Sequence, residues 1–231
     1  MPLMNIQKII YFFIGLLLLV GCGKSGVNEG VIKFDITFNE QERKTNSVID
    51  LLPTNMEQMF KDGSSKCKME GFMGMFLTAL ISNTHTKTNS YIFKVMTDKN
   101  YCQTKFGVKT LGFDPFPGMH LKKTMETKEI AGYKAKKVKV TFDDPKISGY
   151  DIYYTDEISI ENPNWSNPYT EIKGVLLEFR IRMKGITMIV KAKEVVKKEI
   201  PDSEFEIPDG FKKVAPPTLD SIIVKIMNSV K

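Results

Sequence analysis

Short runs of alternating apolar and polar residues, separated by turns that contain glycine, constrain the fold of this chain more than any other feature. Residues 31–38, VIKFDITF, alternate in this way from the second residue on, which is the pattern of a strand with one buried face. Pairs of such runs meet at residues 61–63, 131–132 and 184–185. Because strands joined by so short a turn lie antiparallel, the sequence predicts a mostly β chain built from consecutive hairpins.

The predicted strands are spread over most of the chain. They cover residues 31–38, 55–61, 64–71, 90–97, 100–106, 120–130, 133–142, 150–155, 175–183 and 186–196. The fifth of these runs turns back on the fourth at residues 98–100. Residues 72–82 are apolar throughout and fit either a buried strand or a short helix, since periodicity does not separate the two. A slip in the apolar phase near Lys136 and Lys137 predicts a β-bulge.

Two helices are predicted. A short one covers residues 46–52 and stops before Pro53. The other follows Pro216-Pro217 and has Thr218 as a suitable N-cap. Its apolar residues fall on one face and are Leu219, Ile222, Ile223, Ile226 and Val230. We therefore expect one β domain, residues 31–214, and an amphipathic C-terminal helix, residues 215–231, that serves either as core or as a lid.

An apolar segment, residues 9–20, follows a single basic residue, Lys8, near the start of the chain. About a dozen residues are too few to span a bilayer comfortably, because a transmembrane helix needs roughly 20. A short basic start, an apolar core and small residues at the end are typical of a secretory signal. Residues 1–21 are therefore predicted to be a signal peptide.

Residues 19–22, Leu-Val-Gly-Cys, resemble the bacterial lipobox. In lipobox proteins the signal is cleaved before the cysteine and its sulfur carries a diacylglycerol, and two or more acyl chains anchor a protein stably. The resemblance implies lipidation of Cys22 and a lipid anchor in the inner or outer membrane of the cell envelope, facing the periplasm or the cell surface. Residues 22–30 then form a flexible tether. The alternative is an ordinary signal peptide or signal anchor with a coincidental cysteine.

Two further cysteines, Cys67 and Cys102, lie in predicted strands. Disulfides persist in an oxidising compartment, so an even pair of cysteines in an exported chain favours a disulfide. The alternative is two separate buried thiols, because a disulfide requires a short Cα separation that the sequence does not supply.

The sequence contains no recognisable metal or nucleotide motif. His85 and His120 have no cysteine, aspartate or glutamate at metal-ligand spacing. Nucleophile elbows, phosphate-binding loops and the H-E-x-x-H motif are also missing from the sequence. The formal charge of +6 is spread along the chain, with only short lysine runs such as residues 134–139. Spread charge on an exported protein argues against nucleic acid as a partner and fits weak attraction to anionic headgroups.

Acidic residues do not form a catalytic pattern either. The pairs at residues 143–144 and 156–157 lie at strand ends beside turn residues, and turn chemistry explains them. Glu178 lies inside the apolar run VLLEF and is expected either to face the open side of the sheet or to pair with Arg180 or Arg182. We therefore predict that the protein is not an enzyme, with no catalytic residues, no metal and no cofactor.

Flexible apolar residues are concentrated in the first half of the chain. Methionine is unbranched and recurs on adaptable binding surfaces, which makes these residues candidates for a ligand cavity. The candidates are Met56, Phe60, Met69, Phe72, Met73, Met75, Phe76 and Phe93. The alternative is that they fill an ordinary core.

Three stretches of the chain resemble a group of cell-envelope lipoproteins. Residues 127–142, TKEIAGYKAKKVKVTF, look like the I-G-Y-x-x-x-K hairpin of those families. Residues 172–178, IKGVLLE, lie where the GLPGLI family has its naming motif, here without the proline. Residues 205–211, FEIPDGF, are similar to the terminal F-x-I-P-x-G-Y/F motif. Over residues 30–214 the chain resembles the domain of unknown function 4412 family, which is grouped with LolA/LolB/LppX-like proteins.

The resemblance implies a fold and a kind of ligand. It implies a curved antiparallel sheet, a LolA-like half-barrel, with a few helices on its concave face and an apolar cavity between them. In the transport members of that fold group the cavity holds acyl chains, so a lipid, an acyl chain or a lipidated protein is the expected partner. The second hypothesis is a structural or interaction lipoprotein whose core is self-filled, with protein partners that the sequence does not identify.

Overall fold

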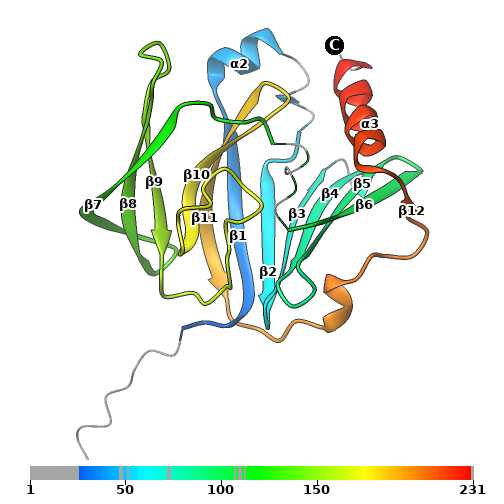
Figure 1. Ribbon diagram of the computed structural model, residues 1–231, viewed down its shortest axis with the longest axis horizontal. Helices are drawn as coiled ribbons and strands as arrows, with labels where there is room; N and C mark the ends of the chain where they lie inside the picture. Colours follow the sequence, from blue (N-terminus) through cyan, green and yellow to red (C-terminus); the bar gives the residue numbers. More distant parts are fainter. Residues whose placement is uncertain are drawn as a thin grey trace, which may run out of the picture.

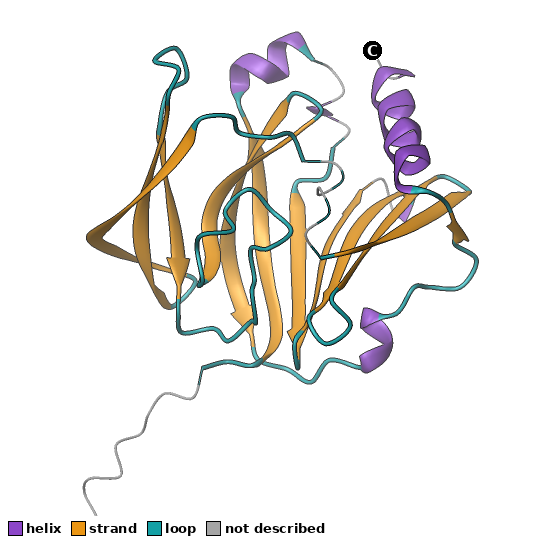
Figure 2. Ribbon diagram, in the orientation of Figure 1, coloured by secondary structure: helices purple, strands orange, loops and turns teal. Residues whose placement is uncertain are grey.

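The computed structural model describes residues 26–46, 49–50, 52–71, 74–106, 108, 111 and 113–229. Within these ranges the chain is mostly β, with 12 strands joined in one sheet (Figures 1 and 2). The prediction of a β-rich chain is thereby confirmed. The predicted signal peptide, residues 1–21, and Cys22 lie outside the described residues, as do Phe72 and Met73.

Every neighbouring pair in the sheet is antiparallel except one. The strands are β1 (Glu29–Phe38), β2 (Asn55–Lys61), β3 (Ser64–Gly71), β4 (Phe76–Asn83), β5 (Thr88–Val95), β6 (Asp98–Lys105), β7 (Met119–Ile130), β8 (Tyr133–Phe142), β9 (Tyr150–Thr155), β10 (Val175–Met183), β11 (Ile186–Val196) and β12 (Lys212–Lys213). Their order across the sheet is β12-β6-β5-β4-β3-β2-β1-β11-β10-β9-β8-β7. Only β12 and β6 run parallel. The sheet is curved and open, with β12 and β7 at its two edges (Figure 1).

The predicted glycine turns adopt the geometry that two-residue hairpins require. Both central residues have positive φ at Asp62-Gly63, at Ala131-Gly132 and at Lys184-Gly185. This left-handed pair matches the right-handed twist of the flanking strands, and glycine adopts it without steric cost. The hairpins β2–β3, β7–β8 and β10–β11 therefore lie where the sequence predicts them.

Other local predictions need correction. The β5–β6 turn lies at residues 96–97, two residues before the predicted position. Met96 adopts a positive φ of 53° in this turn, and a methionine in the sequence does not indicate that conformation. The bulge predicted near Lys136 lies on the opposite strand, where register shifts between Lys123 and Thr127. For the apolar run at residues 72–82, where the sequence left strand and helix open, the structure has a strand, β4, from Phe76 on.

A short helix, α2 (Glu40–Thr45), is found where none was predicted. The Asn39 side chain caps it by accepting a hydrogen bond of 2.8 Å from the Gln41 backbone N–H. Glu40 and Glu42 lie in its first turn and basic residues in its last, which suits the helix dipole. Of the helix predicted at residues 46–52, only residues 49–50 are described as helical.

The sheet has an inner face, which carries most of the hydrophobic core. Phe34 of β1, Met56 of β2 and Phe179 of β10 point to this side and belong to one buried cluster. The loop between β9 and β10 covers the cluster, with the fully buried Tyr169 packed edge-on against Phe179. The core is therefore closed by a loop over this half of the sheet rather than by helices.

The chain wraps around the β6 edge of the sheet, from the outer face to the inner face. Residues 197–211, here called the outer strap, include a 3-10 turn, η3 (Asp202–Phe205). Phe205, Ile207 and Phe211 of the outer strap pack on the outer face of β4 and β5. The chain then pairs with β6 as β12 and continues as α3 (Pro216–Ser229) on the inner face (Figure 1).

The helix α3 packs against the sheet through the apolar face that the sequence predicts. Leu219 and Ile223 are buried against Tyr91, Phe93 and Cys102, and Ile222 is partly buried beside them. The predicted contributions of Ile226 and Val230 lie outside the described side chains.

The predicted tether, residues 22–30, extends too far into the folded part of the chain. Glu29 and Gly30 already belong to β1. Val27 is buried and forms a parallel bridge with Ile158. The polar residues around Val27 do not indicate this contact, and its partner lies in a loop far away in the sequence.

Candidate functional site

A cavity of about 100 Å³ lies on the inner face, between the β2–β5 strands and the loop that covers β10. We call it the main cavity. Its apolar wall is built from residues of five separate segments, which are β2, β3, β4, β10 and the loop between β6 and β7. These include Met56, Met69, Leu80, Leu111, Phe113, Leu176, Phe179, Ile181 and Met183. Apolar walls with a few polar groups are the usual composition of a small-molecule site.

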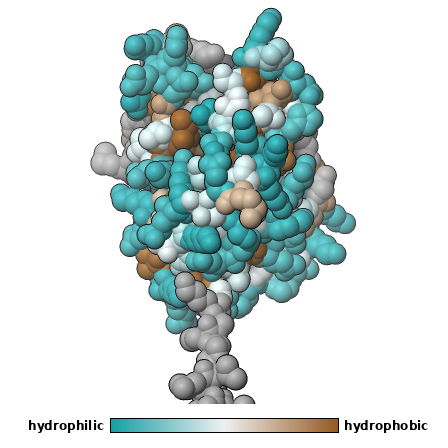
Figure 3. All heavy atoms as spheres, turned by 90° about the vertical axis from the view of Figure 1, so that its left-hand side faces the viewer, coloured by the Kyte–Doolittle hydropathy of each residue, from teal (hydrophilic) through white to brown (hydrophobic). Residues whose placement is uncertain are grey.

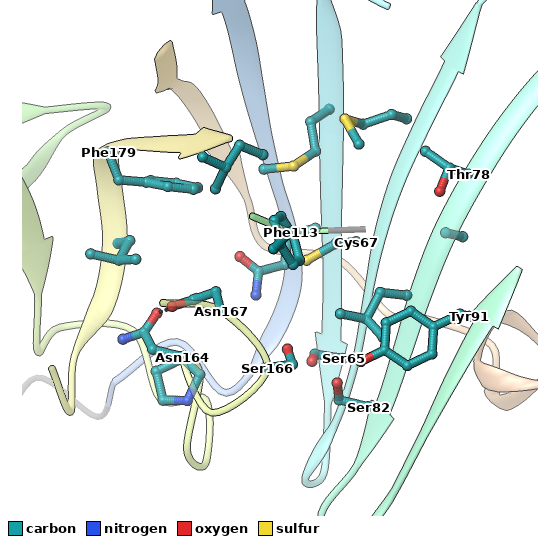
Figure 4. Close-up of a pocket in the computed structure, with 18 of the residues that line it drawn as sticks. Ser65, Cys67, Thr78, Ser82, Tyr91, Phe113, Asn164, Ser166, Asn167 and Phe179 are labelled. Atoms are coloured by element: carbon teal, nitrogen blue, oxygen red, sulfur yellow. Dashed lines mark hydrogen bonds between the residues drawn. The ribbon is translucent and has the colours of Figure 1, made fainter. Parts of the chain in front are cut away.

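Most of the polar side chains labelled in Figure 4 lie toward one end of the main cavity, and Thr78 lies apart from them. Strand register explains part of this grouping, because Ser65 pairs with Ser82 and both point to the inner face. Ser166 comes from the covering loop and lies near them in the close-up (Figure 4). The main cavity therefore has an apolar end and a hydroxyl-rich end.

Several of the polar residues that line the main cavity are more than nine-tenths buried, among them Gln58 and Ser166, each 8 % exposed. No hydrogen bond joins either of these two side chains to another described residue, and neither is among the fully enclosed polar groups without a partner, so their polar atoms open onto the cavity. Buried polar groups are normally paired, so these two are available to a bound molecule or to water.

The covering loop is held in place by its own hydrogen bonds. The buried amide of Asn164 donates to the carbonyls of Ile172 at 2.7 Å and Gly174 at 2.8 Å. The Tyr169 hydroxyl donates to the Arg180 carbonyl at 2.6 Å and contacts the Tyr150 hydroxyl at 2.9 Å. These bonds fix the loop on the sheet and thereby fix the wall of the main cavity.

A second cavity of about 60 Å³ continues along the inner face toward α3. It shares Met69, Thr78 and Met183 with the main cavity, so these side chains form the partition between the two. Ile223 of α3 and Lys184 of the β10–β11 turn border its far side. The Lys184 ammonium pairs with Asp220 of α3 at 2.7 Å, which ties the helix to the turn.

The favoured disulfide between Cys67 and Cys102 is not formed in the structure, where both cysteines are free thiols. Register places Cys67 opposite Leu80, Leu80 opposite Tyr91, and Tyr91 opposite Cys102. The cysteines therefore lie in one row but three strands apart, which is about 14 Å at the usual strand spacing. A disulfide needs Cα atoms within about 7 Å. Burial raises the pKa of the Cys67 thiol to about 12 and that of Cys102 to about 11.

The histidines do not form a site. The His85 ring lies 2.8 Å from the Asp62 carbonyl at a turn. His120 contacts Asp143 at 2.6 Å, and both side chains are exposed. Within the described ranges no group of three potential metal ligands is found.

Glu178 is explained by its neighbours on the outer face. Its carboxylate pairs with Lys128 at 2.7 Å and lies 3.9 Å from Lys191. Of the two alternatives for Glu178, the structure has the first, a position on the open side of the sheet, and pairs the carboxylate with lysines rather than with Arg180 or Arg182. Neighbours on adjacent strands approach more closely than the next residues on the same face of one strand.

The candidate cavity residues divide between several environments. Met56 and Met69 line the main cavity, and Phe76 and Phe93 line the second. Phe60 is fully buried in the core beside the cavities but lines neither. Met75 is 44 % exposed at the turn before β4.

Several cavity residues were missed by the sequence analysis. They include Gln58, Phe113, Ser166, Phe179 and Met183. The strands that hold three of these residues were predicted, and Phe113 and Ser166 lie in loops, so only loop closure and the curvature of the sheet bring the five together. The polar, proline-rich loop at residues 161–170 supplies part of the cavity wall.

Comparison with known proteins adds little. No protein-family model and no curated protein sequence matches the chain. Among solved structures, it is similar to one titled the complex structure of Pseudomonas aeruginosa MucA/MucB, at a TM-score of 0.34 and 10% sequence identity. The match covers 80% of this chain and 57% of that chain. A likeness of this degree carries no argument about function.

Within the described residues, no helix is long and apolar enough to cross a membrane.

Proposed function

We propose that this protein is a membrane-anchored lipoprotein of the cell envelope that binds a hydrophobic ligand, without catalysis. The ligand is a lipid, an acyl chain or a lipidated partner. The observation that carries the proposal is the main cavity, which has methionine and phenylalanine walls and lies beside a second apolar cavity. Apolar surface removed from water stabilises a complex by about 25 cal/mol per Å², so an acyl chain gains affinity without any chemical step.

The partition between the cavities is built from adaptable side chains. Met69 and Met183 separate the two spaces, and methionine changes rotamer at little cost. Rotation of these side chains joins the cavities into one channel along the inner face. The volume present is small compared with typical ligand pockets of about 300–1,000 Å³, so we infer that binding widens the channel.

The proposal also includes the type of half-barrel and the lipid anchor at Cys22. The sheet is taken as a LolA-like half-barrel of the domain of unknown function 4412 type, supported by the order of the sequence motifs, by the open curved sheet and by α3 on its inner face. Cys22 carries the lipid in this proposal, and the domain faces the periplasm or the cell surface. The support for Cys22 is the Leu-Val-Gly-Cys stretch at residues 19–22.

A second candidate function is a structural or interaction lipoprotein with no ligand. The observation that favours it is the limited volume of both cavities, about 100 and about 60 Å³. Cavities of this size are also found as packing defects in ordinary cores.

Lipid mass spectrometry on residues 23–231, secreted without Cys22 and purified without detergent, tests the proposal. Removal of the anchor means that any lipid found is bound rather than attached. A stoichiometric acyl species is the expected result. A lipid-free protein after gentle extraction favours the second candidate, and cross-linking to a protein partner is then the next experiment.

A charged side chain at the partition should abolish the lipid load. Met69→Lys places an ammonium group between two apolar cavities, where its desolvation opposes an acyl chain. The matched control is Met125→Lys, because Met125 is 98 % exposed on the edge strand β7. We expect bound lipid to be lost in the first variant and retained in the second, with both folded by circular dichroism. Equal lipid loads on the two folded variants would place the ligand elsewhere.

A further inference from the structure

The described side chains that line the main cavity are all uncharged. Its polar members in this part of the chain are serine, threonine, tyrosine, cysteine, asparagine and glutamine, and none of the described lysine, arginine, histidine, aspartate or glutamate residues borders it. The charged side chain that borders the second cavity, Lys184, lies at the far end and its ammonium group is paired with Asp220 at 2.7 Å. The binding site of the proposed function therefore has hydrogen-bonding capacity without a free charge.

This composition discriminates between ligand headgroups. An ionised carboxylate or phosphate that enters such a site loses its hydration without gaining an opposite charge, and that loss is costly. An uncharged hydroxyl, ester or amide loses much less and can be compensated by one or two hydrogen bonds. The Gln58 amide offers both a donor and an acceptor, and the Ser166 hydroxyl offers the same from the opposite wall.

The lack of hydrogen-bond partners for the Gln58 and Ser166 side chains also favours an uncharged polar ligand. Gln58 and Ser166 are each more than nine-tenths buried as residues. No hydrogen bond joins either side chain to another described residue, and neither is among the fully enclosed polar groups without a partner, so their polar atoms open onto the cavity. A core that only fills itself would gain stability by replacing Gln58 with an apolar residue of similar size. A polar side chain kept in this position is useful when a ligand supplies the missing partner.

We propose that the site selects an uncharged amphiphile with a single slender chain. The neutral polar head lies between Gln58 and Ser166, and the chain extends past Met69 into the second cavity. The small volumes favour one chain over two. This inference rests on the proposed function, because it specifies the class of ligand for the same cavity.

The test compares three ligands with the same ten-carbon chain: decanamide, 1-decanol and decanoate. The protein is residues 23–231, which contains every described residue of the sheet, the helices and both cavities. Trp165 is the only tryptophan and precedes Ser166 in the covering loop, so its fluorescence reports binding. At about pH 8 we expect the amide and the alcohol to bind at least tenfold more tightly than decanoate. At about pH 4, where decanoic acid is largely neutral, the difference should shrink.

Two variants test the assignment of the head. Gln58→Met keeps the volume but removes the amide, and should weaken decanamide binding about tenfold while leaving decanoate binding unchanged. Ser166→Ala is the second variant, because it removes only one hydroxyl from the loop and leaves the sheet intact. The matched control is Gln103→Met on the exposed side of β6, which should bind all three ligands like the parent.

The outcomes separate this inference from the proposed function. Equal binding of decanoate and decanamide at about pH 8 overturns the inference and leaves the proposed function standing. Loss of decanoate binding in Lys184→Met also overturns it, since the head would then lie at α3. If none of the three ligands binds and no lipid copurifies, both the inference and the proposed function fail.

Discussion

Cys67 shows how the position of one side chain decides its chemistry. It lies on β3 and borders the main cavity, next to Gln58 on the neighbouring strand. Burial raises its pKa to about 12 and that of Cys102 to about 11, from an ordinary value near 9. Both thiols are therefore protonated at neutral pH, and a protonated thiol is a poor nucleophile.

The state of these thiols is directly measurable. On residues 23–231, an alkylating reagent at about pH 8 should react with both cysteines much more slowly in the folded protein than in the unfolded chain, because burial keeps both thiols protonated. After unfolding without reductant it should add two groups, because both thiols are free. Mass spectrometry counts the groups. An unfolded chain that takes up none until it is reduced would contradict the strand order, since a disulfide requires the two cysteines to be adjacent.

The raised pKa values also predict a loss of stability in alkali. Below about pH 9 both thiols are protonated in the folded and unfolded chains, so they contribute no pH dependence. Between about pH 9 and 11 the unfolded chain releases protons that the folded chain retains, and the free energy of unfolding falls by up to ~1.4 kcal/mol per pH unit for each thiol. Denaturant titrations of the parent and of the Cys67→Ala, Cys102→Ala double variant measure this slope. A slope that is the same in both proteins would rule out the thiols as its source.

At the scale of the element, the side chains that α3 buries show whether the helix is part of the core or a lid. Leu219 is 1 % exposed and lies with Ile223 in the same cluster as Tyr91 and Phe93. The salt bridge from Asp220 to Lys184 connects the helix to the β10–β11 turn but leaves both groups partly exposed, so it contributes little beside the apolar contacts. The contacts therefore favour α3 as part of the core over α3 as a loose lid.

Truncation of Leu219 tests this role. Leu219→Ala should lower the free energy of unfolding by about 2–4 kcal/mol, because it leaves a cavity under the helix. Lys225→Ala is the matched control on the exposed side of α3 and should change it by less than about 0.5 kcal/mol. If Leu219→Ala leaves stability unchanged and accelerates lipid exchange, α3 is a lid instead.

At the scale of the whole molecule, charge is arranged on the outside, and part of it is paired. Ion pairs such as Lys33 with Glu194 and Lys136 with Asp156 join neighbouring strands, with both partners about half exposed. The face over β7–β9 is correspondingly hydrophilic, with scattered apolar residues (Figure 3). The lysine-rich strand β8, expected to meet lipid headgroups, has Lys137 already shared between Glu126 and Asp151.

Exposed pairs of this kind predict a weak dependence of stability on salt. Each contributes about 0–1 kcal/mol and is screened at physiological ionic strength. Raising NaCl from about 50 mM to about 500 mM should therefore change the free energy of unfolding of residues 23–231 by less than about 1 kcal/mol. Chemical denaturation in urea, which is uncharged, measures it. A loss of several kcal/mol would mean that the ion pairs hold the sheet together.

The sequence alone determined the local structure where neighbouring residues carry the signal. Alternation within each strand and positive φ at glycine turns depend on residues a few positions apart, so most hairpins and the apolar face of α3 were predicted. Exceptions have local causes, such as the positive φ at Met96 and the capped helix after Asn39. Met56 and Met69, two of the candidates for a ligand cavity, line the main cavity, and ligand binding there stays a prediction.

Tertiary structure alone decided which distant residues meet. The row that holds Cys67 and Cys102 separates them by three strands, although the residue pattern favoured a disulfide. The main cavity joins Gln58 of β2 to Ser166 of a loop that the sequence marks only as polar. Sheet curvature and loop closure depend on the summed packing of the whole core, and no short stretch of sequence encodes that sum.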